Sequence, residues 1–229
     1  MYVVIGGAGM MGINLAQALL EMNYTVAMID TDVVACQYVR EKIGVMAFEG
    51  SAVNTSTLIE AGIRKANVVI ATLREDALNL AMVTLSKHYG VPQIVARMKD
   101  SDFAEPYALA GANHVISTNQ LAVNRIINAI EYPQIDAMMH FEQGQVEVLK
   151  LSIPHQCYIV GQCVAEIAQN PHFPKGTLII GYQAHPEEDL IIPNGKTILE
   201  EGSTILVVTK PNLVRSVIDF LGICNLSSG

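Results

Sequence analysis

The sequence predicts an α/β protein with a doubly wound parallel sheet, followed by a second, smaller α+β domain. A strand, a glycine loop, a helix and another strand follow one another over residues 2–30. Short apolar runs then alternate with helical patterns up to about residue 131, and beyond residue 136 apolar and polar residues alternate instead. Strands that alternate with helices form right-handed crossovers, and such crossovers build a parallel sheet.

The first helix follows a loop that is suited to phosphate. Residues 2–5 form a short β-branched run, and Gly7, Gly9 and Gly12 follow it in the spacing G-x-G-x-x-G. Gly7 permits a sharp turn, Gly9 has no Cβ to block a pyrophosphate, and Gly12 allows the helix to pack closely on the strand. The first amides of the helix expected over residues 10–22 have no intrahelical acceptor, so an anion is their natural partner.

An acidic residue ends the second strand. Asp30 follows the apolar run 25–29, where a carboxylate can accept hydrogen bonds from ribose hydroxyls and disfavours a 2′-phosphate. The alternative is that the glycines make only a tight turn and that Asp30 caps the next helix. Because strand, loop, helix, strand and acid occur in register, the sequence favours nucleotide binding on a Rossmann-like domain.

The same alternation continues through the first domain. The expected helices span residues 33–43, 55–61, 77–88, 102–110 and 120–131, and the further strands span residues 45–48, 68–71, 93–96 and 115–116. Ligands of such sheets bind at the carboxyl ends of the strands. The candidate cofactor-binding residues at these ends are Gly7, Ala8, Gly9, Met10, Met11, Gly12, Asp30, Thr31, Asp32, Ser51, Ala52, Thr72, Leu73 and Arg97, with Arg74 beside them.

Composition indicates a self-associating protein without a membrane span. The chain has 229 residues, 51% of them hydrophobic, and a mean hydropathy of +0.33. No apolar run approaches the roughly 20 residues that a membrane helix needs. We expect the apolar surplus to be buried in a sheet covered on both faces and in a homo-oligomer interface. The N-terminus lacks a charged leader, so we expect the protein in the cytoplasm.

Charge and cysteine usage argue against several other classes. The net charge of −8 and the absence of a basic run predict no nucleic-acid partner and no direct lipid contact. The four cysteines include no C-x-x-C pair, and the histidines lack the spacing of metal ligands, so we expect neither a disulfide framework nor a metal site.

The second domain is expected over residues 139–229, after a first domain over residues 1–138. Its first strand is predicted to turn Val146, Val148 and Leu151 inward and Glu147 and Lys150 outward. Further helices are expected over residues 160–168 and 213–221, and further strands over residues 177–182, 190–193 and 204–209.

Several motifs accompany these elements. They include GGAGMMG at residues 6–12, VAMIDTD at residues 26–32, and an A-x-VVIAT run followed by D-x-x-N from Asp76 to Asn79. In the second domain a pattern runs from Pro193 through Leu199, Gly202 and Ser203 to Leu206. On these motifs, nearly the whole chain resembles the RCK (also called KTN) regulatory subunits of potassium channels and of Trk- and Ktr-type potassium uptake systems.

The resemblance implies a gating subunit that forms dimers or rings on an integral-membrane potassium transporter or channel subunit, at the inner face of the cell membrane. It also implies NAD(H) or ATP/ADP in the first domain and, in some members, cyclic di-AMP in the second. The exposed apolar run expected at residues 190–192 is a further reason to consider a ligand in the second domain.

The chain departs from the family pattern at three places. Met10 stands where an arginine often reaches the terminal phosphate of ATP, and residues 117–120 stand where Pro-Glu often serves a cation. Ser51 replaces the acid of a common Gly-Asp-Ala, and its hydroxyl can still bond adenosine.

Two residues have alternative roles. Arg97 is expected either to face a phosphate or to pair with Asp100 or Asp102, and Asn79 either to lie at an interface or to cap a helix. For the whole chain, regulation is favoured over the alternative, an NAD-dependent oxidoreductase, because the second domain shows no Lys, His and Tyr constellation for hydride chemistry.

Overall fold

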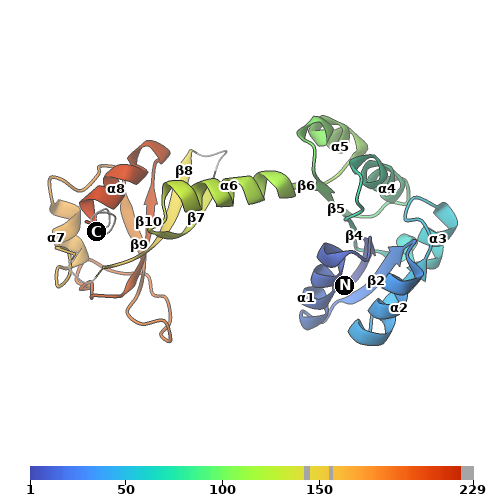
Figure 1. Cartoon of the computed structure of the whole chain (residues 1–229), viewed down its shortest axis with the longest axis horizontal. Helices are drawn as coiled ribbons and strands as arrows, with labels where there is room; N and C mark the ends of the chain where they lie inside the picture. Colours follow the sequence, from blue (N-terminus) through green and yellow to red (C-terminus); the bar gives the residue numbers. More distant parts are fainter. Residues whose placement is uncertain (142–144, 155–156, 223–229) are drawn as a thin grey trace. The chain divides into compact units, whose positions relative to one another are not determined.

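The computed structural model describes residues 1–141, 145–154 and 157–222. The chain divides into two compact units, Met1–Val123 and Asn124–Gly229. The first is built on a parallel sheet and the second on an antiparallel one (Figure 1). Among the residues described, no helix is both long and apolar enough to cross a bilayer.

The first unit is doubly wound, as predicted. Its six strands lie in the order β3-β2-β1-β4-β5-β6, and all neighbouring strands are parallel. The strands are β1 Tyr2–Gly6, β2 Thr25–Asp30, β3 Met46–Glu49, β4 Val68–Ala71, β5 Gln93–Met98 and β6 His114–Ser117. The helices are α1 Met10–Glu21, α2 Val33–Tyr38, α3 Thr55–Glu60, α4 Asp76–His88 and α5 Ala104–Ala110. Helix α6, Thr118–Glu131, begins in the first unit and continues into the second.

The strands of this sheet are apolar on both faces, and each face is covered by helices. Val4 packs in a cluster with residues of α3, α4 and α5, whereas its neighbours Val3 and Ile5 pack in a cluster with residues of α1 and α2. All three are fully buried. Successive strand residues point to opposite faces, so a strand covered on both faces must be apolar throughout.

Two predicted helices are divided in the structure. The expected helix over residues 33–43 is α-helical to Tyr38 and then forms a π-helical turn over Val39–Ile43. The expected helix over residues 102–110 begins as a 3₁₀ turn, Ser101–Phe103, and becomes α-helical at Ala104. An α-helix from residue 102 would need an N–H on residue 106, and Pro106 has none.

The second unit is a small α+β module. Its sheet has the order β7-β8-β10-β9 and is antiparallel. The elements are β7 Ile135–Phe141, β8 Val146–Ser152, α7 Val164–Gln169, β9 Leu178–Gln183, β10 Thr204–Thr209, a 3₁₀ turn Pro211–Leu213 and α8 Val214–Phe220. Strand β7 was not anticipated as a separate element.

The predicted orientation of β8 is correct for Leu151, which is buried, and for Lys150, which is exposed, but wrong for Val146, Glu147 and Val148. Leu149 and Leu151 are fully buried and Glu147 is 5% exposed, whereas Val146 and Val148 are only partly buried. The apolar core contributed by β10, α7 and α8 lies on the odd-numbered side. The expected strand over residues 190–193 is also absent as a strand, since only Ile191 forms a bridge, to Tyr182.

Candidate functional site

A pocket of about 1070 Å³ lies at the carboxyl ends of β1, β2, β4 and β5. It collects all the candidate residues except Ser51 and Ala52. Those that line it are Gly7, Ala8, Gly9, Met10, Met11, Gly12, Asp30, Thr31, Asp32, Thr72, Leu73 and Arg97, together with Arg74. Ser51 instead accepts a hydrogen bond from the Val53 amide, and Ala52 is 3% exposed in the core.

Five further residues line the pocket: Asn14, Leu15, Ala35, Glu75 and Leu78. All but Glu75 lie on α1, α2 or α4 rather than at a strand end. Asn14 stands one helical turn after Met10, so the helical period contained a signal for it. The helical period gave no such signal for Leu78, because packing of α4 on the sheet decides which side of that helix faces the pocket.

The three motif glycines are constrained differently. Gly7 has φ +105°, and a Cβ there would lie 3.0 Å from the Thr72 carbonyl oxygen. A Cβ on Gly12 would lie 2.0 Å from the Gly7 carbonyl oxygen. Gly9 has φ −74°, and a Cβ there would meet no atom within 4 Å. The fold therefore requires glycine at the first and third positions, while the free space above Gly9 belongs to the pocket.

The N-terminus of α1 offers hydrogen-bond donors to this space. No side chain caps the helix, and its first intrahelical bond runs from the Ile13 amide to the Gly9 carbonyl oxygen, at 3.0 Å. Within the described residues, the amides of Met10, Met11 and Gly12 have no hydrogen-bond acceptor. Such amides, with the positive end of the helix dipole, favour an anion.

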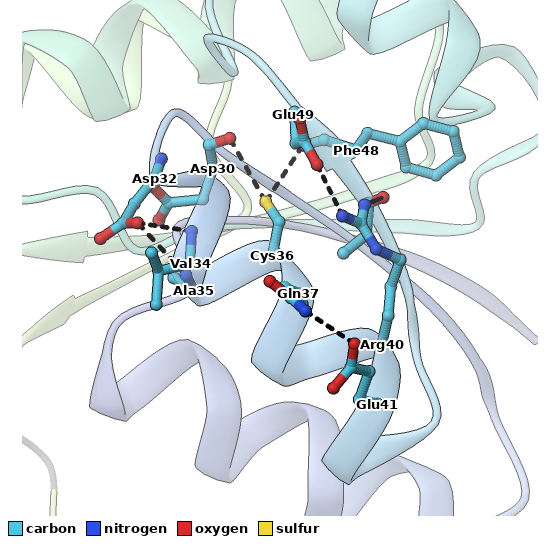
Figure 2. A network of polar contacts seen from close by, with 11 residues as sticks. Asp30, Asp32, Val34, Ala35, Cys36, Gln37, Arg40, Glu41, Phe48 and Glu49 are labelled. Atoms are coloured by element: carbon cyan, nitrogen blue, oxygen red, sulfur yellow. Dashed lines mark hydrogen bonds and ion pairs between the residues drawn. The ribbon is translucent and has the colours of Figure 1, made fainter.

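Asp30 is bonded to the glycine loop itself. Its Oδ2 accepts a hydrogen bond from the Ala8 amide at 2.6 Å, and its Oδ1 accepts one from the Asp32 amide at 2.9 Å. Asp32 is the residue that caps α2, with bonds from the Val34 and Ala35 amides (Figure 2). The alternative that Asp30 caps the helix is therefore wrong. Each Asp30 oxygen keeps a second lone pair, which a ribose hydroxyl can use.

A buried thiol lies behind Asp30. The Cys36 Sγ is 3.5 Å from the Asp30 carbonyl oxygen and 3.6 Å from the Phe48 carbonyl oxygen (Figure 2). Burial raises the pKa of this thiol, so it stays protonated and can donate weakly to these oxygens. Cys157 is likewise buried, Cys163 is partly buried, and Cys224 lies outside the described residues.

The opposite wall carries the basic residues. Arg97 donates from Nε to the Thr118 hydroxyl at 3.4 Å, and Asp100 instead accepts from the Asp102 amide. In the described part of the chain, Arg97 makes no ion pair with either acid. Arg97 and Arg74 both line the pocket, and β5, which carries Arg97, is separated by β1 and β4 from β2, which ends with Asp30.

Asn79 plays neither of its expected roles. It is 1% exposed, and its amide bonds the backbones of Leu73 and Arg97 rather than capping a helix or lying on an outer surface. In the described ranges, no group of three His, Cys, Asp or Glu residues is placed to hold a metal ion.

The parallel sheet, the glycine loop and the pocket define a Rossmann-type domain joined to a small antiparallel module. Residues 3–118 match the model of the TrkA-N domain, and residues 148–222 match that of the TrkA-C domain. The chain therefore belongs to the TrkA family.

Two relatives show how much of the chain is matched by proteins of the family. The chain is 28% identical to a Trk system potassium uptake protein TrkA homolog of Methanothermobacter thermautotrophicus, over 94% of this chain and 96% of the relative. It is 27% identical to Trk system potassium uptake protein TrkA of Vibrio alginolyticus, over 96% of this chain and 49% of the relative. The chain thus spans about half the length of the second relative.

Solved structures share the fold. The GsuK RCK domain is 23% identical with a TM-score of 0.55, covering 97% of this chain and 46% of its own. The GsuK channel bound to NAD is 21% identical with a TM-score of 0.53, and the match covers 97% of this chain and 38% of the GsuK chain. The Kef CTD of Shewanella denitrificans in its AMP-bound form is 25% identical with a TM-score of 0.51, covering 59% and 84%.

The glycine geometry predicts different effects on stability. Gly12→Ala should lower the free energy of unfolding by about 2–3 kcal/mol, because the new Cβ overlaps the Gly7 carbonyl oxygen. Gly9→Ala should change it by less than about 0.5 kcal/mol, because the space is open and the backbone is ordinary. Urea denaturation, monitored by circular dichroism, measures the free energy of unfolding of both variants. Equal losses in the two variants would contradict the different steric roles assigned to Gly9 and Gly12.

Proposed function

We propose that the chain is a nucleotide-binding regulatory subunit of a potassium transporter or channel. Its N-terminal domain, residues 1–138, binds an adenine nucleotide, either NAD(H) or ATP/ADP. Its C-terminal module, residues 139–229, completes a subunit that docks from the cytoplasm on an integral-membrane partner. Membership of the TrkA family and the names of its relatives support this role.

The observation that carries nucleotide binding is the space above Gly9. A Cβ at this position would meet no atom within 4 Å, so packing does not require glycine there, whereas the close approach of a ligand does. The unbonded amides of α1 can donate to an anion, the free lone pairs of Asp30 can accept from ribose hydroxyls, and Arg97 supplies positive charge in the pocket. These are the groups that a phosphorylated nucleoside needs.

The pocket also favours regulation over hydride transfer. None of its lining residues is Lys, His or Tyr. An oxidoreductase needs a proton donor or acceptor beside the reacting carbon, a role that His fills most often. Two of the carboxylates in the pocket, Asp30 and Asp32, already accept hydrogen bonds from backbone amides. A regulator needs only a ligand that binds one conformation of an oligomer more tightly than another, which shifts the population between them.

Helix α6 provides a surface for self-association. None of its 14 residues is buried. Val123, Ile126, Ile127 and Ile130 recur at helical spacing and are 47%, 60%, 45% and 74% exposed. A contiguous exposed apolar stripe of this kind indicates an interaction surface. A second copy of this chain, which carries the same stripe, can cover it, in line with the apolar surplus of the sequence.

Thermal-shift titration tests the proposed ligand. ATP, ADP, AMP, NAD⁺, NADH and cyclic di-AMP are added in turn, because a ligand that binds only the folded state raises the melting temperature. We expect an adenine nucleotide to stabilise the protein, and Gly9→Val to abolish that shift while melting like the wild type. A shift retained in Gly9→Val would place the ligand elsewhere, such as the exposed run at residues 190–192, where we propose cyclic di-AMP. No shift with any nucleotide contradicts the proposal.

Asp30→Ala should weaken nucleotide binding about tenfold to a hundredfold, because hydrogen bonds from ribose to a carboxylate are lost. Glu49→Ala is the control, since Glu49 ends the neighbouring strand, carries the same charge and does not line the pocket. Calorimetric titration with NADH and ADP measures both variants. Unchanged affinity in Asp30→Ala would refute the ribose assignment.

Ile127→Glu should weaken self-association at least about tenfold, because a charge would be buried against an apolar partner surface. Ile59→Glu on α3 is the matched control, as Ile59 is 41% exposed and Ile127 is 45% exposed. Light scattering after gel filtration, over a dilution series, reports the mass of each. If both variants keep the wild-type mass, α6 does not form the interface.

A further inference from the structure

Asn79 joins the ends of two neighbouring strands. Its Oδ1 accepts a hydrogen bond from the Leu73 amide at 2.7 Å. Its Nδ2 donates to the Leu73 carbonyl oxygen at 3.1 Å and to the Arg97 carbonyl oxygen at 3.2 Å. Leu73 follows β4, and Arg97 belongs to β5. Both residues line the pocket, whereas Asn79 does not.

These bonds replace a ladder that has ended. The pairing of β4 with β5 stops at Ala71 and Ala96. Beyond that point Leu73 and Arg97 have no partner across the β4–β5 pair, although Arg97 still pairs with Ile116 of β6 on its other side. Buried backbone groups are costly to leave unbonded. With 1% of its surface exposed, the Asn79 amide supplies the missing partners from the first turn of α4.

A second buried side chain, Tyr107, contacts the same carbonyl. Its single hydroxyl proton is shared among three acceptors: the Asp76 Oδ1 at 3.0 Å, the Asp76 carbonyl oxygen at 3.2 Å and the Arg97 carbonyl oxygen at 3.2 Å. Burial, reinforced by the Asp76 carboxylate, raises the pKa of Tyr107, so the hydroxyl stays protonated and able to donate. Asp76 also accepts hydrogen bonds from the amides of Lys99 and Asp100. The segment after β5 is thus held from both α4 and α5.

We propose that Asn79, with Tyr107 behind it, is a positioning residue for the nucleotide pocket. It acts through Leu73 and Arg97, whose backbones it holds so that their side chains stay in the pocket before a ligand arrives. Without this brace, binding has to order the two strand ends as well, and that cost lowers affinity. The inference rests on the proposed function and assigns a specific support to its site.

The test compares three variants of the full chain by calorimetric titration with NADH and with ADP, well below their melting temperatures. Asn79→Ala should weaken binding about tenfold, and Tyr107→Phe, which keeps the ring, about threefold. Asn113→Ala is the matched control. Asn113 accepts a hydrogen bond from the Ile94 amide at 2.7 Å, at the amino ends of the strands and away from the pocket, so its loss should change affinity less than twofold.

Urea denaturation of the same variants separates positioning from stability. A residue that is merely structural would lower the free energy of unfolding without changing the affinity of the folded protein. If Asn79→Ala folds and binds nucleotide with wild-type affinity, this inference is wrong and the proposed function still stands. If Asn79→Ala fails to fold, wild-type affinity in Tyr107→Phe shows that the inference is wrong. Absence of nucleotide binding by the wild-type protein overturns the proposed function and this inference together.

Discussion

The hydrogen bond between the Ala8 amide and the Asp30 carboxylate, 2.6 Å long, is the contact on which the site depends. It joins the loop after β1 to the end of β2, so the glycine turn cannot move independently of the neighbouring strand. Gly7 and Gly12 make the turn sterically possible. The bond fixes where the loop lies, and therefore where the free amides of α1 point.

The rest of the pocket is held in the same way, by hydrogen bonds from side chains to backbone groups at the strand ends. The Thr72 hydroxyl gives the Gly6 carbonyl oxygen a second hydrogen bond beside that from the Thr72 amide, and Asn79 joins Leu73 to Arg97. Each parallel strand ends in backbone groups that need partners, and here polar side chains from adjacent elements supply them. A pocket held by satisfied buried groups is ordered before a ligand arrives, which reduces the entropy lost on binding.

In the regulatory role that we propose, an ordered pocket affects how strongly a ligand shifts the conformation of the protein. A ligand shifts a conformational equilibrium only by the difference in its affinity for the two states. The ligand affinity of a rigid pocket depends strongly on small changes in the surrounding structure, because loop movement does not compensate for poor contact geometry. We propose the exposed apolar stripe of α6, the helix that follows β6, as the place for such changes between copies of the chain.

Local sequence determined the alternation of strands and helices, the glycine loop and the acid at the end of β2, because each follows from periodicity or from the conformational freedom of glycine. Most candidate site residues also followed from one rule, that parallel strands present their carboxyl ends at one edge. The partners of Asn79, the exclusion of Ser51 and Ala52 from the pocket, and the inward face of β8 were decided by tertiary structure. They depend on which elements pack together in three dimensions, and a single buried contact of that kind outweighs the local pattern.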